Sequence, residues 1–222
     1  MPASLLSYRR FIEEVDVRCN RLVLIHRSHL SCRKGCSACC TDISVLAVEA
    51  YAILRGVGAS FAPYGRGSTG SEKTAGLEET TDSIRQPESC VFLDREEACR
   101  IYPYRPFICR THGLPLLYPI LEYDEEGRER KADEPQWQLF YCDLNFQGVK
   151  DEEMERYFTQ ENILNMEEWN QQLVLINEWF RGSADGSSFL KAIRQGKFGK
   201  SAQKELFQTG RIPLSSLGWV LL

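Results

Sequence analysis

The alternation of apolar and polar residues predicts a long helix at the start of the chain. Residues 4–30 repeat apolar positions at steps of three and four, as one face of an amphipathic helix does. The apolar seam consists of Leu5, Tyr8, Ile12, Val15, Cys19, Leu22, His26 and His29. We expect Cys19 to be a small buried hydrophobe there, and the two histidines to be structural groups or helix C-terminal cations.

Shorter patterns follow this helix. Residues 43–45 predict a short strand, and residues 46–55 predict a helix that Gly56 and Gly58 end. Residues 58–88 are rich in glycine, serine, threonine and charge, which predicts a long mobile surface loop.

Two β-hairpins are predicted next. Residues 90–102 place apolar runs on both sides of a charged turn, and residues 114–146 do so around a longer polar loop, with a return strand over 137–144. We expect the resulting small antiparallel sheet to carry Cys90, Cys99, Cys109 and Cys142.

The remaining chain is predicted to be helical. Asn165 and Glu168 form a plausible capping pair for a helix over 166–181, and a shorter helix covers 188–194. The apolar tail from Ile212 is expected to pack back on the domain or on a second subunit. We therefore expect an α+β fold with a cysteine-cluster domain over 1–150 and a helical extension over 151–222 packed on it.

Charge and hydropathy exclude several classes of partner. The net charge of −4 and the dispersed basic residues give no basis for nucleic-acid binding. No apolar run approaches the roughly 20 residues that cross a bilayer. The first twenty residues lack the uninterrupted apolar core of a signal peptide, so we expect a cytoplasmic protein without membrane contact.

The sequence contains nine cysteines, and these indicate what the protein binds. A reducing cytoplasm disfavours disulfides, so many cysteines there indicate metal or redox chemistry. Cys32, Cys36, Cys39 and Cys40 fall within nine residues, and on a helix their sulfurs would share an arc of about 100°. Gly35 weakens a helix, so a turn leading into a short helix is the alternative.

The adjacent pair of Cys39 and Cys40 bears on the kind of metal group. On a helix the two side chains point about 100° apart, which suits two irons of one cluster, or two sites, better than one ion. Four thiolates satisfy either zinc or an iron–sulfur cluster. Eight cysteines therefore allow two four-thiolate sites, or one site and a redox or structural set. We favour an iron–sulfur cluster over zinc.

The spacing of these eight cysteines resembles the CxxCxxCC, or YkgJ-type, family, whose domain is described as zinc- or iron-chelating. The resemblance rests on C-x3-C-x2-C-C, then CVFL, then CRIYPYRPFICR, and a last cysteine. The opening spacing is x3 here, whereas x2 is commoner in the family. The metal ligands expected from the pattern and the resemblance together are Cys32, Cys36, Cys39, Cys40, Cys90, Cys99, Cys109 and Cys142.

Three further residues accompany the family blocks. Arg105 and Arg110 are expected to bind the cofactor, by donating hydrogen bonds to cluster sulfurs or offsetting thiolate charge. The alternative is that each pairs with a carboxylate on the hairpin. His112 stands two residues beyond Cys109 in C-x2-H spacing, which is a weaker ligand signal.

Three hypotheses about function follow. The first is a metal-binding protein for electron transfer or metal handling. The second is an enzyme, because the resemblance extends to bacterial flagellin lysine-methylases, which use S-adenosylmethionine. The third is a structural zinc module that presents its C-terminal helices and tail to a protein partner. The sequence contains no glycine-rich nucleotide motif or P-loop to support a particular enzyme.

Overall fold

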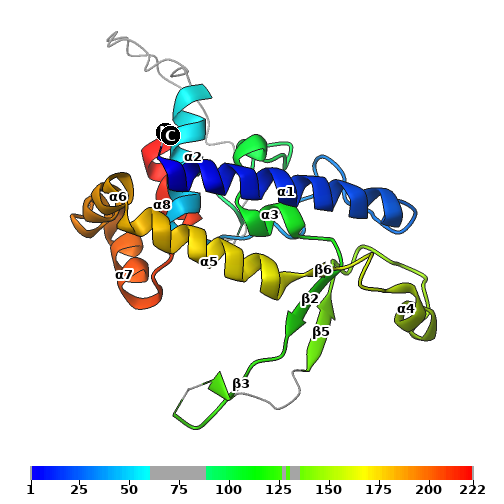
Figure 1. The fold of residues 1–222 in the computed structure, drawn as a ribbon. Coiled ribbons are helices and arrows are strands. Elements are labelled where there is room, and N and C mark those ends of the chain that lie inside the picture. Colours follow the sequence, from blue (N-terminus) through cyan, green and yellow to red (C-terminus); the bar gives the residue numbers. More distant parts are fainter. Residues whose placement is uncertain (1, 61–88, 127–128, 131–135, 222) are drawn as a thin grey trace, which may run out of the picture.

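The computed structural model of this protein describes residues 2–60, 89–126, 129–130 and 136–221 (Figure 1). The predicted loop over 58–88 therefore lies outside the described residues from residue 61 onward. In the described part, helices and small sheets form the α+β fold that the pattern predicted. The helices are α1 (Ala3–His26), α2 (Ala47–Ser60), the 3-10 helix η1 (Tyr102–Tyr104), α3 (Phe107–Thr111), α4 (Asp151–Tyr157), α5 (Met166–Gly182), α6 (Ala184–Arg194), α7 (Gly199–Thr209) and α8 (Leu214–Leu221).

The strands are short and belong to three sheets in the described part of the chain. They are β1 (Ser44–Val45), β2 (Leu116–Pro119), β3 (Glu122–Tyr123), β4 (Glu129–Arg130), β5 (Trp137–Phe140), β6 (Leu164–Asn165) and β7 (Ile212–Pro213). In the largest sheet, β2 pairs antiparallel with β5, Leu116 opposite Phe140, and parallel with β6. The second predicted hairpin is thus confirmed. Its return strand ends at Phe140, so Cys142 lies beyond it.

The long helix α1 confirms the first prediction, although it ends at His26 rather than residue 30. The predicted seam is buried except at Ile12 and His29, which are half-buried; Phe11 joins the core, and His29 lies beyond the end of the helix. Cys19 lies in this seam as expected, and burial raises its pKa to about 11. His26 is fully buried, and its ring nitrogens contact the Tyr157 hydroxyl at 2.8 Å and the Asn162 carbonyl at 2.6 Å. It is a structural histidine.

Helix α2 continues to Ser60, so the prediction that glycine ends it at residue 56 was wrong. The ring of Tyr104 packs directly on Gly56: a Cβ there would lie 2.3 Å from the Tyr104 Cδ1 atom. Gly56 is therefore a point of close approach inside the helix and not a cap.

The two strands of the first predicted hairpin were also wrong, although its chain reversal around the charged turn is present. Residues 90–102 form turns with a single bridge, in which Leu93 faces Cys99. The Asp94 carboxylate accepts hydrogen bonds from the Glu96 and Ala98 amides and closes a tight turn in place of strand pairing. None of the four cysteines expected on a sheet lies in a strand: Cys109 is in α3, and Cys90, Cys99 and Cys142 are in turns or loops.

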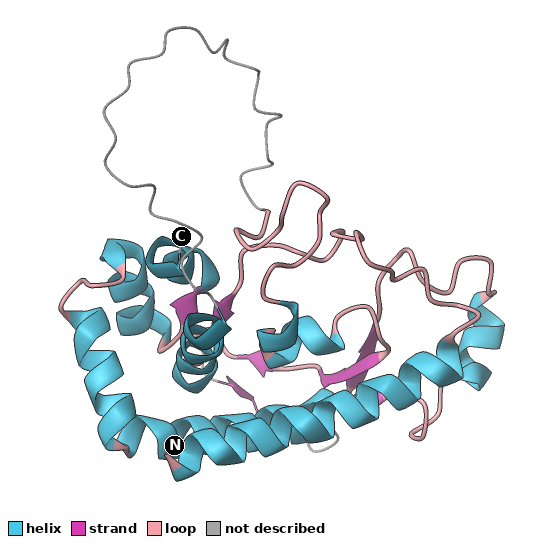
Figure 2. Ribbon diagram, turned by 90° about the horizontal axis from the view of Figure 1, so that it is seen from above, coloured by secondary structure: helices cyan, strands magenta, loops and turns pink. Residues whose placement is uncertain are grey.

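The apolar core lies beside the first part of α1. Helices α1 and α5 run side by side, and α2, α6 and α8 pack near them (Figure 1). Figure 2 shows these helices crowded at one end of α1, whereas most loops lie along its other half. Ile212, Leu214 and Leu217 are buried, which confirms that the tail packs back on the protein. Among the described residues, no helix is long and apolar enough to cross a membrane.

Candidate metal centre

The first four cysteines lie in consecutive turns. Cys36 donates its backbone N–H to Arg33, and Cys40 donates to Ser37. Cys32 is exposed, whereas the other three are half-buried. The segment therefore forms turns, as the alternative expected, but the short helix of that alternative is absent from residues 31–43. The arc of sulfurs expected for a helix does not apply.

Cys90, Cys99 and Cys109 lie against this segment. The Cys90 N–H donates to the Cys40 carbonyl at 3.0 Å, beside a bridge between Thr41 and Ser89. The Ser37 hydroxyl donates to the Glu97 carboxylate at 2.8 Å, which packs the two turns together. These contacts bring the second family block to the first.

Cys142 reaches the first segment through Asn145, a residue that the sequence analysis missed. Asn145 is 2% exposed, and its backbone N–H donates to the Cys142 carbonyl at 2.8 Å. Its side-chain oxygen accepts from the Ser31 N–H at 2.7 Å, and its amide nitrogen lies 3.5 Å from the Cys32 sulfur. The same nitrogen donates to the Gly113 carbonyl at 2.6 Å.

The eight expected ligands line two adjoining hollows. The larger, of about 640 Å³, is lined by Cys19 and all expected ligands except Cys142, and we call it the cysteine hollow. The smaller, of about 570 Å³, is mostly apolar and is lined by Cys39, Cys142 and His112. All nine cysteines are free thiols. In the described part of the chain, no three His, Cys, Asp or Glu side chains are already arranged to hold one metal ion.

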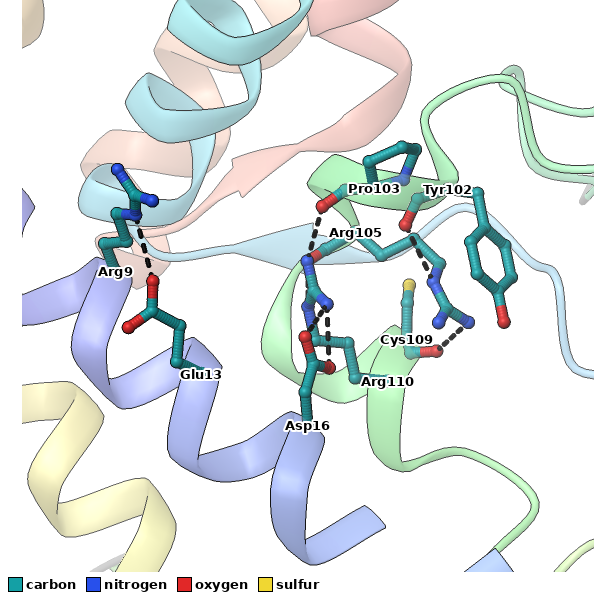
Figure 3. Close-up of polar contacts among 8 residues, drawn as sticks. All are labelled: Arg9, Glu13, Asp16, Tyr102, Pro103, Arg105, Cys109 and Arg110. Carbon is teal, nitrogen blue, oxygen red and sulfur yellow. Dashed lines mark hydrogen bonds and ion pairs between the residues drawn. The ribbon is translucent and has the colours of Figure 1, made fainter. Parts of the chain in front are cut away.

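The Arg110 side chain makes contacts that anchor α3 to α1 (Figure 3). Its Nη1 atom lies 2.8 and 2.7 Å from the two carboxylate oxygens of Asp16, and its other donors bind the Arg105 and Pro103 carbonyls. Arg110 thus pairs with a carboxylate, on α1 rather than on the hairpin. Its contact with a cofactor stays a prediction.

Arg105 lies closer to the sulfurs. It donates to the Tyr102 and Cys109 carbonyls at 3.1 Å, and its guanidinium lies 3.6 Å from the centre of the Tyr102 ring (Figure 3). Its positive charge lowers the pKa values of Cys39, Cys99 and Cys109, although burial outweighs it at Cys99 and Cys109. A guanidinium beside several thiols favours their anionic, metal-binding form.

Three thiols of the expected ligand set have strongly shifted pKa values. A hydrogen bond from Cys40 lowers the pKa of Cys39 to about 6, and the same contact, with burial, raises that of Cys40. Burial, together with the charges of Cys90 and Cys99, raises the pKa of Cys109 to about 12. His112 lines both hollows, and burial lowers its pKa, which favours the neutral imidazole that metals bind.

Glu49 positions the helix that carries Cys109. Its carboxylate is 4% exposed and accepts the Leu46 N–H at 3.0 Å and the Phe107 N–H at 2.9 Å. These amides belong to the starts of α2 and α3, whose first N–H groups lack partners within the helix. One buried carboxylate therefore joins the two helices.

Thiols drawn from distant segments into one region are the ligand set of a metal-chelating domain. Residues 31–143, about half of the chain, match the model of the CxxCxxCC family, described as "Putative zinc- or iron-chelating domain", and the chain belongs to this family. Neither a search of curated proteins nor a search of solved structures found a match to the chain.

Proposed function

We propose that this protein holds an iron–sulfur cluster or zinc through cysteine thiolates, with an iron–sulfur cluster as the preferred occupant, and serves electron transfer or metal handling. The observation that carries the proposal is the gathering of eight free thiols, from distant parts of the chain, around two adjoining hollows. Membership of a zinc- or iron-chelating family supports it.

The donor set fits both candidate groups. Thiolates are the ligands of iron–sulfur clusters and of many zinc sites. The cysteine hollow, at about 640 Å³, has room for a group wider than one ion, which favours a cluster. When bound, such a cluster supplies one-electron redox chemistry, and zinc supplies structural cross-linking. Arg105 would offset part of the thiolate charge.

The exposure of the site favours electron transfer or metal handling over a structural role. Cys32 is exposed, and the remaining expected ligands are half-buried rather than enclosed. Structural zinc sites are closed by their four ligands, whereas a group that exchanges electrons or metal needs access from outside. This contrast is the reason for preferring the first hypothesis over a structural zinc module.

Metal analysis of protein purified without oxygen tests the proposal. We expect brown protein that absorbs near ~400 nm and contains iron and sulfide. Colourless protein with stoichiometric zinc would show that the thiolates bind zinc instead of an iron–sulfur cluster. We expect Cys109→Ala to bind less metal than the unsubstituted protein, and Cys19→Ala, whose thiol lines the same hollow, to bind as much.

Protein that binds neither metal after anaerobic reconstitution would refute the proposal. Tight, saturable binding of S-adenosylmethionine by the metal-loaded protein would instead support the methylase hypothesis.

A further inference from the structure

The cysteines divide into two neighbourhoods according to the contacts around them. Asn145 binds the Cys32 sulfur through its side chain and the Cys142 carbonyl through its backbone, so these two cysteines share one anchor. Cys36 and Cys39 follow Cys32 in the same run of turns. Cys142 also lines the smaller hollow together with Cys39.

A separate chain of contacts joins the other four. The Cys90 N–H binds the Cys40 carbonyl at 3.0 Å. Cys99 is tied to the segment after Cys90 by its bridge to Leu93 and by the hydrogen bond from the Arg100 N–H to Phe92. The Tyr102 N–H donates to the Cys99 carbonyl at 3.3 Å, and Arg105 donates to both the Tyr102 and the Cys109 carbonyls. These contacts link Cys109 to Cys99.

The lining of the two hollows is compatible with this division. Cys142 lines the smaller hollow, and Cys39 lines both. Cys40, Cys90, Cys99 and Cys109 all line the cysteine hollow, and none of them lines the smaller one.

We propose that the eight cysteines form two four-thiolate centres, one of Cys32, Cys36, Cys39 and Cys142 and the other of Cys40, Cys90, Cys99 and Cys109. This assignment rests on the proposed function and adds the number of centres and the ligands of each. Four thiolates are a full ligand set for zinc or for an iron–sulfur cluster, so neither centre needs a further ligand. The Cys39–Cys40 peptide connects the two centres directly, since consecutive Cα atoms are about 3.8 Å apart.

Cadmium distinguishes one centre from two, because Cd²⁺ is a soft ion that thiolates bind and its NMR signal reports each site separately. The full chain is depleted of metal, reduced, and titrated with Cd²⁺ without oxygen. We expect two bound ions per chain and two resonances. In Cys142→Ala one resonance should be lost or shifted, and in Cys99→Ala the other. Cys19→Ala, whose thiol lines the cysteine hollow but belongs to neither set, should keep both.

A second variant tests the assignment without replacing a cysteine, because replacing a cysteine can unfold the protein. Asn145→Ala keeps all eight thiols and removes the anchor of Cys32, so it should weaken Cd²⁺ binding at one centre by about 10–100-fold and leave the other resonance unchanged. Circular dichroism confirms that each variant is folded.

One bound ion per chain, or loss of the same resonance in Cys142→Ala and Cys99→Ala, would overturn the two-centre assignment. Both results would leave thiolate binding, and hence the proposed function, intact. Failure to bind Cd²⁺ at all would overturn both proposals together.

Discussion

Gly113 brings the backbone close to a proposed ligand, the Cys32 thiol. Its φ of +91° lies in the left-handed region, which side-chain-bearing residues rarely adopt. A Cβ on Gly113 would lie 2.8 Å from the Cys32 sulfur and 3.6 Å from the Asn145 amide nitrogen. Both the backbone angle and the space around Cys32 therefore require glycine.

We expect Gly113→Ala to weaken metal binding as well as stability, because the methyl group displaces the Cys32 sulfur. Gly148→Ala is the matched control: its φ is +81°, and no atom lies within 4 Å of its added Cβ. Each substitution should lower the free energy of unfolding by about 1–3 kcal/mol through backbone strain. Metal affinity, measured by competition with a chelator, should fall in Gly113→Ala alone. Equal affinities in the two variants would show that Cys32 tolerates the methyl group.

At this scale, sequence reasoning found the clustered thiols but not the side chains that contact them. The eight cysteines were evident from spacing. Asn145 was not, because its contact with Cys32 spans 113 positions and no local pattern marks it. Asp16 was missed as the partner of Arg110 for the same reason, since a helical carboxylate resembles any solvent-facing residue.

At the scale of elements, Glu49 links the starts of α2 and α3 through its carboxylate. It occupies the third position of α2, where a glutamate side chain reaches back to the N–H before the helix, and it also accepts the first N–H of α3. Burial raises its pKa, and the two N–H donors lower it. The orientation of α3, and with it the position of Cys109, therefore depends on one carboxylate.

Glu49→Ala should destabilise the protein strongly, since two buried N–H groups lose their acceptor at a cost of about 1–3 kcal/mol each. Glu14→Ala, on the exposed face of α1, should change stability by less than about 0.5 kcal/mol. Chemical denaturation of both variants measures the difference. A small effect of Glu49→Ala would mean that water or a shift of α3 satisfies these groups.

Elements with strong periodicity were predictable, and turns made by side chains were not. Helices α1 and α5 followed from apolar spacing, because each buries one continuous face. The pairing of β2 with β5 followed from two apolar runs on either side of a polar loop. Residues 90–102 carried a hairpin pattern, yet the Asp94 carboxylate competes for the amides that strand pairing would use. Gly56 was taken for a helix end because its contact with Tyr104 cannot be seen in the sequence.

At the scale of the whole molecule, the apolar core and the thiols lie along different parts of α1. Phe11 and the first turns of α1 pack against α3 and α5, whereas Cys19, Asn20 and Val23, further along, line the cysteine hollow. The thiol-bearing turns are held mainly by isolated backbone hydrogen bonds. The core helices therefore have a source of stability that does not involve a metal.

Removing the metal should accordingly loosen the turns and leave the core folded. We expect hydrogen exchange to accelerate in residues 32–40 and 89–102 after chelation, and to stay unchanged in α5 and in the first half of α1. The melting temperature should also fall, because a ligand at about a thousand times its dissociation constant stabilises the folded state by about 4 kcal/mol. Adding the same chelator to protein already depleted of metal is the control and should change neither measurement. If exchange in α5 also accelerated, the metal would hold the whole fold together, as it does in small zinc-dependent domains, and the core described here would be insufficient by itself.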